Sequence, residues 1–263
     1  MKWLCIGDVV SSPGRSAVRD YLEDHESDYD LIIANGENTS GGTGLTRDNA
    51  QDLLRYGVDV ITGGNHIWKK SDFVEYLSNN PDELPVIRPA NYPGEPPGRG
   101  HRIFQLKGFK ILVANIQGRT FMESIDCPFQ TIDNIIDSIQ YDLALVDFHA
   151  EATSEKIAMG RHLSGKVTGV VGTHTHVQTA DEQILDGGTG YITDLGMTGP
   201  KNSILGVRTE LATKRFLTGR PIRFKVEKQG PRILNALSIT VDEDEHEATR
   251  VQRIFEQLPE RTY

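Results

Sequence analysis

Two histidines that lie two residues apart, His174 and His176, follow the apolar run 167–171 and form a compact pair of metal donors. Where a chain is extended, side chains at positions i and i+2 lie on one face, so both imidazoles could serve a single site. A lone His-x-His is nevertheless more often incidental than metal-binding. The pair therefore indicates a metal site only if further donors lie near it.

Other apolar runs also end in residue types that bind metal ions. These residues are Asp8 after run 3–6, Glu37 and Asn38 after 31–34, Asn65 after 58–62 and His149 after 143–146. A dinuclear site needs a carboxylate that bridges two ions, several terminal oxygen or nitrogen donors and room for a bridging hydroxide. Each residue has an ordinary alternative, such as turn capping by Asp8 or a core position for His149. Their recurrence at successive strand ends favours one shared dinuclear site.

The segment Gly63-Gly64-Asn65-His66 combines close backbone approach with two polar side chains. Glycine lets the backbone come near another group because it has no Cβ atom. Asn65 offers a neutral oxygen ligand, and His66 stands one residue further out. A histidine beside a dinuclear centre, rather than within it, can protonate a departing alkoxide. We therefore interpret His66 as a catalytic acid and not as a ligand.

The elements that must position these residues alternate between strand and helix over the first 80 residues. This order predicts an α/β fold with a largely parallel sheet, whose functional residues gather at the carboxyl ends of the strands. Later strands are expected at 143–146, 191–194, 222–226 and 233–239, whereas 250–258 is ambiguous between strand and helix. A second sheet packed on the first and enclosed by helices would accommodate them. No clear boundary divides the chain, so we expect one domain over residues 1–263.

Composition limits the cellular location and the classes of binding partner that we expect for this chain. The 263-residue chain is 37% hydrophobic and 25% charged, as soluble globular proteins are. Its net charge of −9 predicts no broad nucleic-acid binding and no attraction to anionic membranes. A small phosphate ester is still allowed as a ligand, because a metal site supplies local positive charge. Two cysteines, no signal peptide and no membrane-spanning run favour a cytoplasmic protein without a membrane partner. Homo-oligomerisation stays open.

Several ordered blocks resemble the calcineurin-like metallophosphoesterases, and their longer forms resemble the YmdB-like bacterial branch of that superfamily. The blocks are Ile6-Gly7-Asp8-Val9-Val10, Asn35-Gly36-Glu37-Asn38, Gly64-Asn65-His66, the stretch 147–156 that begins Asp147-Phe148-His149, the stretch 172–181 with Thr173-His174-Thr175-His176, and Met197-Thr198-Gly199-Pro200. The resemblance covers nearly the whole chain. It implies an α/β fold of the calcineurin-like type, a four-layer α-β-β-α sandwich with two mixed sheets and a dinuclear metal site at strand ends.

The resemblance also implies how the ligands divide between two ions. Asp8, Glu37, Asn38 and His176 would hold one ion, and Glu37, Asn65, His149 and His174 the other. The chain departs from the wider superfamily pattern, because Val10 occupies a position that is usually histidine and Glu37 replaces the usual bridging aspartate. More oxygen and fewer nitrogen donors suit hard divalent or mixed-valence ions, so iron or manganese is favoured while zinc stays open.

The activity implied by the resemblance is hydrolysis of small phosphodiesters, with 2′,3′-cyclic nucleotides of the 2′,3′-cAMP type as the expected substrates. A metal-bridged hydroxide would attack phosphorus, and His66 would act as general acid. One alternative is a regulatory or RNA-associated metal-binding protein with incidental phosphodiesterase activity. Another is a different dinuclear metal hydrolase, such as an amidohydrolase. Amidohydrolases generally place His-x-His on the first strand, whereas here that pair comes late.

Overall fold

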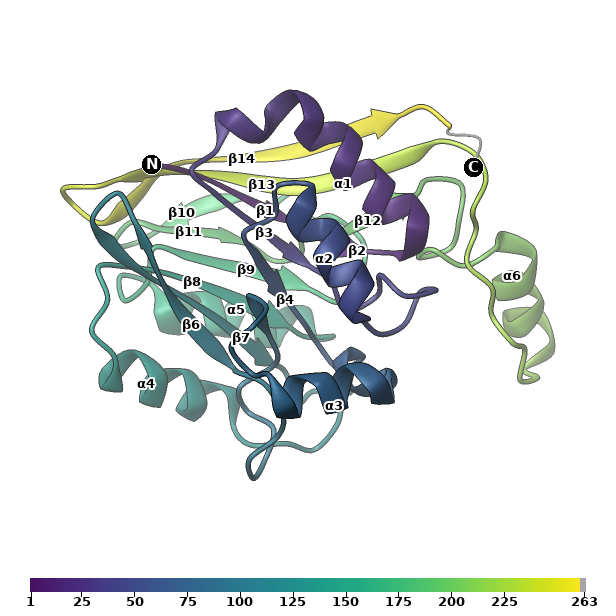
Figure 1. The fold of residues 1–263 in the computed structure, drawn as a ribbon, viewed down its shortest axis with the longest axis horizontal. Coiled ribbons are helices and arrows are strands. Elements are labelled where there is room, and N and C mark those ends of the chain that lie inside the picture. Colours follow the sequence, from purple (N-terminus) through teal and green to yellow (C-terminus); the bar gives the residue numbers. More distant parts are fainter. Residues whose placement is uncertain (261–263) are drawn as a thin grey trace.

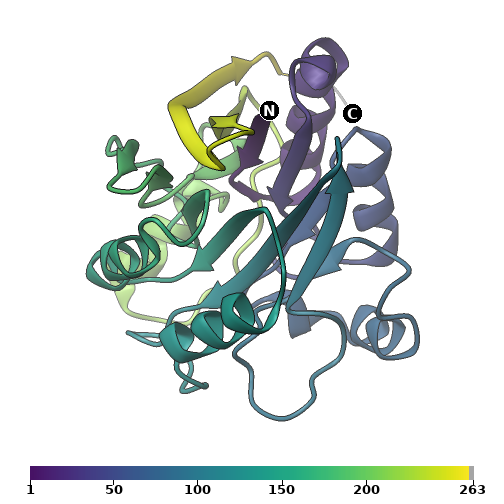
Figure 2. The ribbon, with the colours of Figure 1, turned by 90° about the vertical axis from the view of Figure 1, so that its left-hand side faces the viewer.

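Two β-sheets lie face to face, with helices on the outside of both, in a computed structural model that describes residues 1–260 (Figure 1). The last three residues of the single domain expected over 1–263 lie outside the described residues. Figure 2 shows the early helices, in purple and blue, on one side of the sheets and the teal helices on the opposite side. The expected four-layer α-β-β-α sandwich with two mixed sheets is therefore confirmed.

The first sheet contains the N-terminal strands and the long C-terminal hairpin. Its order is β2 (Asp8–Val9), β12 (Met197–Pro200), β13 (Arg232–Asp242), β1 (Lys2–Ile6), β3 (Leu31–Asn35), β4 (Val60–Thr62) and β5 (Val86–Ile87). Strands β1, β3, β4 and β5 run parallel, whereas β13 is antiparallel to β1 and also pairs with β14 (Glu247–Leu258). The ambiguous segment 250–258 is thus a strand, because β13 supplies a partner along its whole length.

The second sheet is built mainly from the middle of the chain. Its order is β10 (Gln183–Leu185), β11 (Thr189–Ile192), β9 (Gly169–Thr173), β8 (Leu143–His149), β7 (Phe109–Gln117) and β6 (His101–Leu106). The four central strands run parallel, and both edge strands are antiparallel to their neighbours. The carboxyl ends of β8 and β9 therefore lie side by side, with His149 opposite Thr173.

Alternating side chains of the strands produce three separate hydrophobic layers. In β1, Leu4 and Ile6 pack toward the first group of helices, whereas Trp3 and Cys5 lie between the two sheets. This division follows from the two-residue repeat of a strand. The helices outside the first sheet are α1 (Ser11–His25), α2 (Arg47–Arg55) and α3 (Ser71–Asn79), with the short 3₁₀ turns η1 (Glu26–Asp28) and η2 (Ile67–Lys69). Helices α4 (Pro128–Ser138) and α5 (Thr153–Leu163) cover the second sheet.

One expected strand does not form. The alternating apolar pattern predicts a strand at 222–226, but of this segment only Val226 makes a bridge, to Val207. The segment belongs instead to residues 201–230, which leave the sandwich and carry α6 (Thr209–Thr218) (Figure 1). An alternating pattern makes a strand only where a neighbouring strand accepts its hydrogen bonds, and among residues 1–260 no full strand pairs with this segment. Within residues 1–260, no helix is both long enough and apolar enough to cross a membrane.

Candidate metal centre

The eight residues singled out from the sequence lie together where strands of both sheets end. They are Asp8 on β2, Glu37 and Asn38 in the turn after β3, Asn65 and His66 in the turn after β4, His149 at the end of β8, and His174 and His176 just after β9. Parallel strands present their carboxyl ends at one edge, so residues distant in sequence meet there. Two sheets contribute, because the sandwich brings their edges together.

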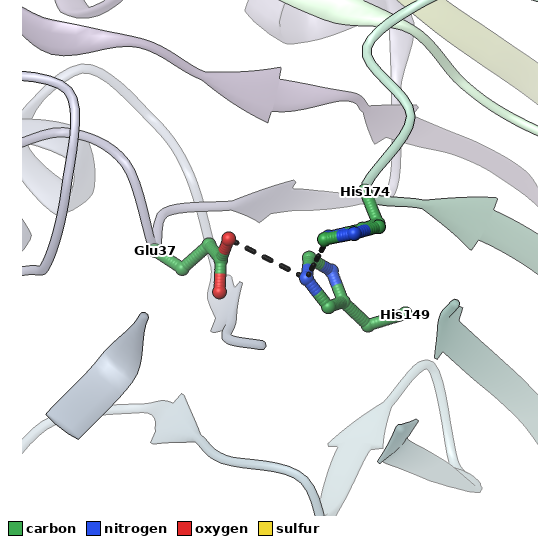
Figure 3. A group of neighbouring side chains, drawn as sticks. All are labelled: Glu37, His149 and His174. Atoms are coloured by element: carbon green, nitrogen blue, oxygen red, sulfur yellow. Dashed lines mark hydrogen bonds and ion pairs between the residues drawn. The ribbon is translucent and has the colours of Figure 1, made fainter. Parts of the chain in front are cut away.

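One group of donors surrounds His149. Its Nε2 atom lies 3.2 Å from Asn65 Oδ1, 3.1 Å from His174 Nδ1 and 3.4 Å from Glu37 Oε1. Figure 3 shows Glu37, His149 and His174 pointing toward one another, and each can offer one ligand atom within 4.8 Å of the others. Four potential donors thus face one small volume.

A second group contains Asp8, Asn38 and His176. Asp8 Oδ1 lies 3.6 Å from His176 Nε2, and Asn38 Nδ2 lies 3.3 Å from the same nitrogen. The amide oxygen of Asn38 instead faces His66 Nδ1 at 2.8 Å. The Asn38 amide must therefore turn over before it can offer oxygen to a cation beside Asp8 and His176.

The Glu37 carboxylate stands between the two groups. It accepts a hydrogen bond from Asn38 Nδ2 at 3.0 Å and lies 3.4 Å from His149 Nε2. Burial opposes ionisation of Glu37, but the neighbouring His149 and His66 outweigh it and hold its pKa well below the ordinary value. Glu37 is thus a buried carboxylate in contact with members of both groups, which is the position that a bridging ligand requires.

Within residues 1–260, the cluster contains two buried polar atoms without a partner, together with a neutral imidazole. Asp8 Oδ1 and His176 Nδ1 are buried and have no hydrogen-bond partner among the described residues, although buried polar atoms are nearly always paired. Burial, and then the charge of His149, lower the pKa of His174 to about 3, so its imidazole is neutral and keeps a lone pair for a ligand. Carboxylate, amide and imidazole donors together suit divalent metal ions.

His66 lies beside the two groups rather than inside either. Its backbone N–H donates to Glu37 Oε2 at 2.8 Å, and its Nδ1 atom lies 2.8 Å from Asn38 Oδ1 and 3.1 Å from Glu37 Oε1. The side chain is 29% exposed, whereas Glu37 is 1% exposed. These contacts fix one ring nitrogen and leave Nε2 available to a bound molecule.

Gly64 packs its backbone directly against the cluster. A Cβ atom at this position would lie 2.3 Å from both Glu37 Oε2 and His149 Nε2. No side chain can occupy that space while both donors stay in place. The glycine that the sequence indicated for close approach is therefore required by the geometry of the cluster itself.

The turn that carries the two late histidines has an unusual backbone. His174 and His176 have φ values of 101° and 66°, a region that non-glycine residues rarely adopt. The Asp194 carboxylate accepts hydrogen bonds from the Thr175 backbone and hydroxyl at 3.1 and 2.7 Å, and it pairs with buried Lys156. A buried ion pair thus holds the turn between the histidines.

A second buried support lies beneath His149. Its Nδ1 atom contacts Thr173 Oγ1 at 2.9 Å, and that hydroxyl donates to Asp147 Oδ1 at 2.7 Å. The other oxygen of Asp147 accepts a hydrogen bond from Thr62, and burial raises the pKa of this carboxyl to about 6. Such contacts orient ligating imidazoles.

Sequence reasoning did not assign a role to Asp147, Lys156 or Asp194. Lys156 lies in a helix and Asp194 follows a strand, so each has an ordinary surface interpretation. Charged residues inside otherwise apolar runs, as Asp147 is in 143–148, are the signal that could have indicated buried partners.

Comparison with known proteins now identifies the family. The family model described as "YmdB-like protein" matches residues 4–254 of this chain. The chain belongs to the YmdB-like family. A relative from Bacillus subtilis, the 2′,3′-cyclic-nucleotide 2′-phosphodiesterase, is 43% identical over 259 residues and 97% of each chain. This curated relative of the YmdB-like chain carries the name of a hydrolytic enzyme.

Two solved structures share the YmdB-like architecture. A hypothetical protein from Thermus thermophilus has a TM-score of 0.93 at 39% identity, covering 98% of this chain and 100% of that one. A phosphatase from Mycoplasma pneumoniae has a TM-score of 0.91 at 34% identity, covering 98% and 94%. The two-sheet sandwich is therefore the fold of these relatives along nearly their whole length.

Proposed function

We propose that this YmdB-like protein is a metal-dependent phosphodiesterase that hydrolyses small phosphodiesters, with 2′,3′-cyclic nucleotides as its substrate class. The observation that carries the proposal is the position of the Glu37 carboxylate between two donor groups, with His66 at its side. The name of the Bacillus subtilis relative supports the choice of substrate. In two-metal sites the pair of cations stabilises the attacking and leaving oxygens of a displacement at phosphorus, and a neighbouring acid protonates the leaving oxygen.

Two ions would share Glu37. Asp8, Asn38 and His176 would complete the ligands of one, and Asn65, His149 and His174 those of the other. Iron or manganese suits the oxygen-rich donor set, and zinc also fits it. Bound cations of this kind neutralise the phosphoryl oxygens and lower the pKa of water.

His66 would hold a proton at Nε2 and deliver it to the departing ribose oxygen. Its Nδ1 atom faces Glu37 and the Asn38 amide; once that amide has turned its oxygen to a cation, its NH2 group would face Nδ1 and leave the ring proton on Nε2 for the substrate. Partial exposure gives that nitrogen access to a bound ester. Because a ribose alkoxide is a poor leaving group, protonation at this oxygen contributes strongly to the rate.

Removal of the metal ions is the direct test of the proposed function. Protein treated with a chelator and desalted is expected to lose hydrolysis of 2′,3′-cAMP and to regain it with Mn²⁺ or Fe²⁺. Metal content measured before and after treatment should follow the activity, toward two ions per chain. Full turnover by metal-free protein would contradict the proposal. Cleavage of an amide panel without cleavage of bis-p-nitrophenyl phosphate would instead favour an amidohydrolase.

Gly64→Ala is expected to weaken metal binding although it removes no donor. The added Cβ would lie 2.3 Å from atoms of Glu37 and His149, so one of these side chains must move. We expect metal affinity to fall on the order of 10–100-fold, the loss typical of disturbed ligand orientation. Titration with Mn²⁺ measures this effect. Gly63→Ala is the control, because its Cβ would meet no atom closer than 3.3 Å. Unchanged affinity in Gly64→Ala would place the ions elsewhere.

A further inference from the structure

Residues 201–230 form an arm whose charge is opposite to that of the rest of the protein. The arm contains eight Lys and Arg residues and two Glu residues, a net charge of +6. The remaining chain then has 20 basic and 35 acidic residues, a net charge of −15. In Figure 1 the arm extends away from the sheets, with α6 as its only helix. The overall charge of −9 therefore conceals a local basic surface.

Most of the basic side chains in the arm have no acidic partner within residues 1–260. Arg208 contacts both acidic residues of the arm, at 2.9 Å from Glu210 and 4.0 Å from Glu227. Across residues 1–260, none of the other basic side chains in the arm has a carboxylate within 4.0 Å, and all of them are exposed. These are Lys201, Lys214, Arg215, Arg220, Arg223, Lys225 and Lys228. A surface with so many uncompensated cations attracts polyanions.

Exposed aromatic rings lie among these cations. Phe216 is 79% exposed and Phe224 is 43% exposed. The Arg215 guanidinium lies 5.3 Å from the centroid of the Phe224 ring. Aromatic rings interleaved with cations are what single-stranded nucleic acids need, because bases stack on the rings while phosphates meet the charges.

The base of the arm packs against the segment that follows the metal cluster. A Cβ atom at Gly42 would lie 2.7 Å from Val226 of the arm, and Gly42 is only four residues beyond Asn38. A cavity of about 450 Å³ lies at this junction, lined by Gly41, Arg208, Lys225 and Lys228 among others. The arm is thus joined to the loop that leaves the catalytic cluster, and the junction itself is basic.

From this arrangement we infer that the substrate class includes RNA chains that end in a 2′,3′-cyclic phosphate, and that the arm binds the nucleotides preceding that end. The inference rests on the proposed function. Only ribose can form a 2′,3′-cyclic phosphate, so a polymer with this terminus is RNA. Hydrolysis adds water across one P–O bond of the terminal ring and leaves a phosphate monoester. The rest of the chain continues from the 5′ oxygen of the terminal nucleotide and needs a basic surface beside the metal cluster.

A comparison of two substrates tests this inference. One is 2′,3′-cAMP, and the other is a single-stranded oligoribonucleotide of about six nucleotides with a 2′,3′-cyclic phosphate. We expect kcat/KM to be higher for the oligoribonucleotide at low salt. Its advantage should fall by roughly twentyfold over a fourfold rise in salt if three phosphates are contacted, because the slope is about −0.7 per phosphate for single strands.

The triple variant Arg220→Gln, Arg223→Gln and Lys225→Gln should raise KM for the oligoribonucleotide by about tenfold. Hydrolysis of 2′,3′-cAMP should be unchanged, since the mononucleotide does not reach the arm. The control neutralises two exposed cations near the opposite ends of the strands, Lys110 and Arg250, and should change neither substrate.

The outcomes separate the inference from the proposed function. If neither substrate is cleaved, the proposed function fails. If 2′,3′-cAMP is cleaved but the oligoribonucleotide is no better, or if the arm variant affects both substrates equally, only the inference fails. If the arm variant changes the sedimentation of the protein and leaves the oligoribonucleotide advantage intact, the arm binds a second, acidic copy of the chain instead of RNA.

Discussion

Replacement of His66 by alanine is expected to lower kcat for 2′,3′-cyclic nucleotides by about 10²–10⁴-fold, the usual contribution of a general acid, while both metal ions stay bound. The side chain contacts Asn38 and Glu37 but belongs to neither donor group. The hydrogen bond from the residue 66 backbone to Glu37 Oε2 survives the substitution. Glu37 should therefore keep its position. Steady-state kinetics together with elemental analysis measure both effects.

The choice of leaving group distinguishes proton donation from a structural role of His66. p-Nitrophenolate departs without protonation, so hydrolysis of bis-p-nitrophenyl phosphate should fall much less than hydrolysis of the cyclic nucleotide. His162→Ala serves as control, because His162 contacts Asp133 and Phe129 on the opposite helical layer. Equal losses with both substrates, or release of the metal ions from His66→Ala, would reject the role of His66 as general acid.

Replacement of Glu37 by alanine is expected to deplete both ions and reduce turnover to background. The Glu37 carboxylate is 1% exposed and contacts a donor from each group, Asn38 and His149. One side chain that serves two cations cannot be lost without affecting both. Metal content per chain after purification, with circular dichroism to confirm folding, is the measurement.

Asp8→Ala is the informative comparison for Glu37→Ala. Asp8 contacts His176 and the His174 backbone, so as a ligand it would serve one ion only. We expect this variant to keep about one of two ions, in line with the division of ligands in dinuclear sites. If Glu37→Ala also keeps one ion, or keeps both, Glu37 does not bridge.

The donor residues could be predicted because strand ends are readable from local pattern. Apolar runs followed by Asp8, Glu37 or His149 mark where buried strands meet the surface. Parallel strands place such ends at one edge, so convergence follows from the order of the elements. The family resemblance added the division of ligands between two ions, which no local pattern contains.

Other features depended on contacts between segments far apart in the sequence. The Lys156–Asp194 pair joins a helix to a strand end 38 residues later and supports the turn at Thr175. Neither residue is distinctive alone, since a lysine in a helix usually faces solvent. Only the packing of α5 against the second sheet buries the pair.

The arm is a second feature that patterns in the sequence did not predict. Its alternating pattern at 222–226 predicts a strand, and the overall charge of −9 predicts no broad attraction to nucleic acid. Both expectations ignore the spatial neighbours of the segment. Within residues 1–260 only Val226 of the segment forms a bridge, and the arm that carries the cations extends away from the sheets (Figure 1). Charge acts over about 10 Å at ordinary ionic strength, so local distribution decides what a surface attracts.

The sequence by itself determined the donor types, their places at strand ends, the α/β class and the family resemblance, because each depends on residue identity and short-range periodicity. Tertiary structure alone decided that Glu37 stands between two donor groups, that Gly64 leaves the space they need, and that the basic arm adjoins the loop beyond Asn38. These features are distances between segments that lie far apart along the chain. Such distances follow from how the sheets pack, and no pattern within a single segment specifies them.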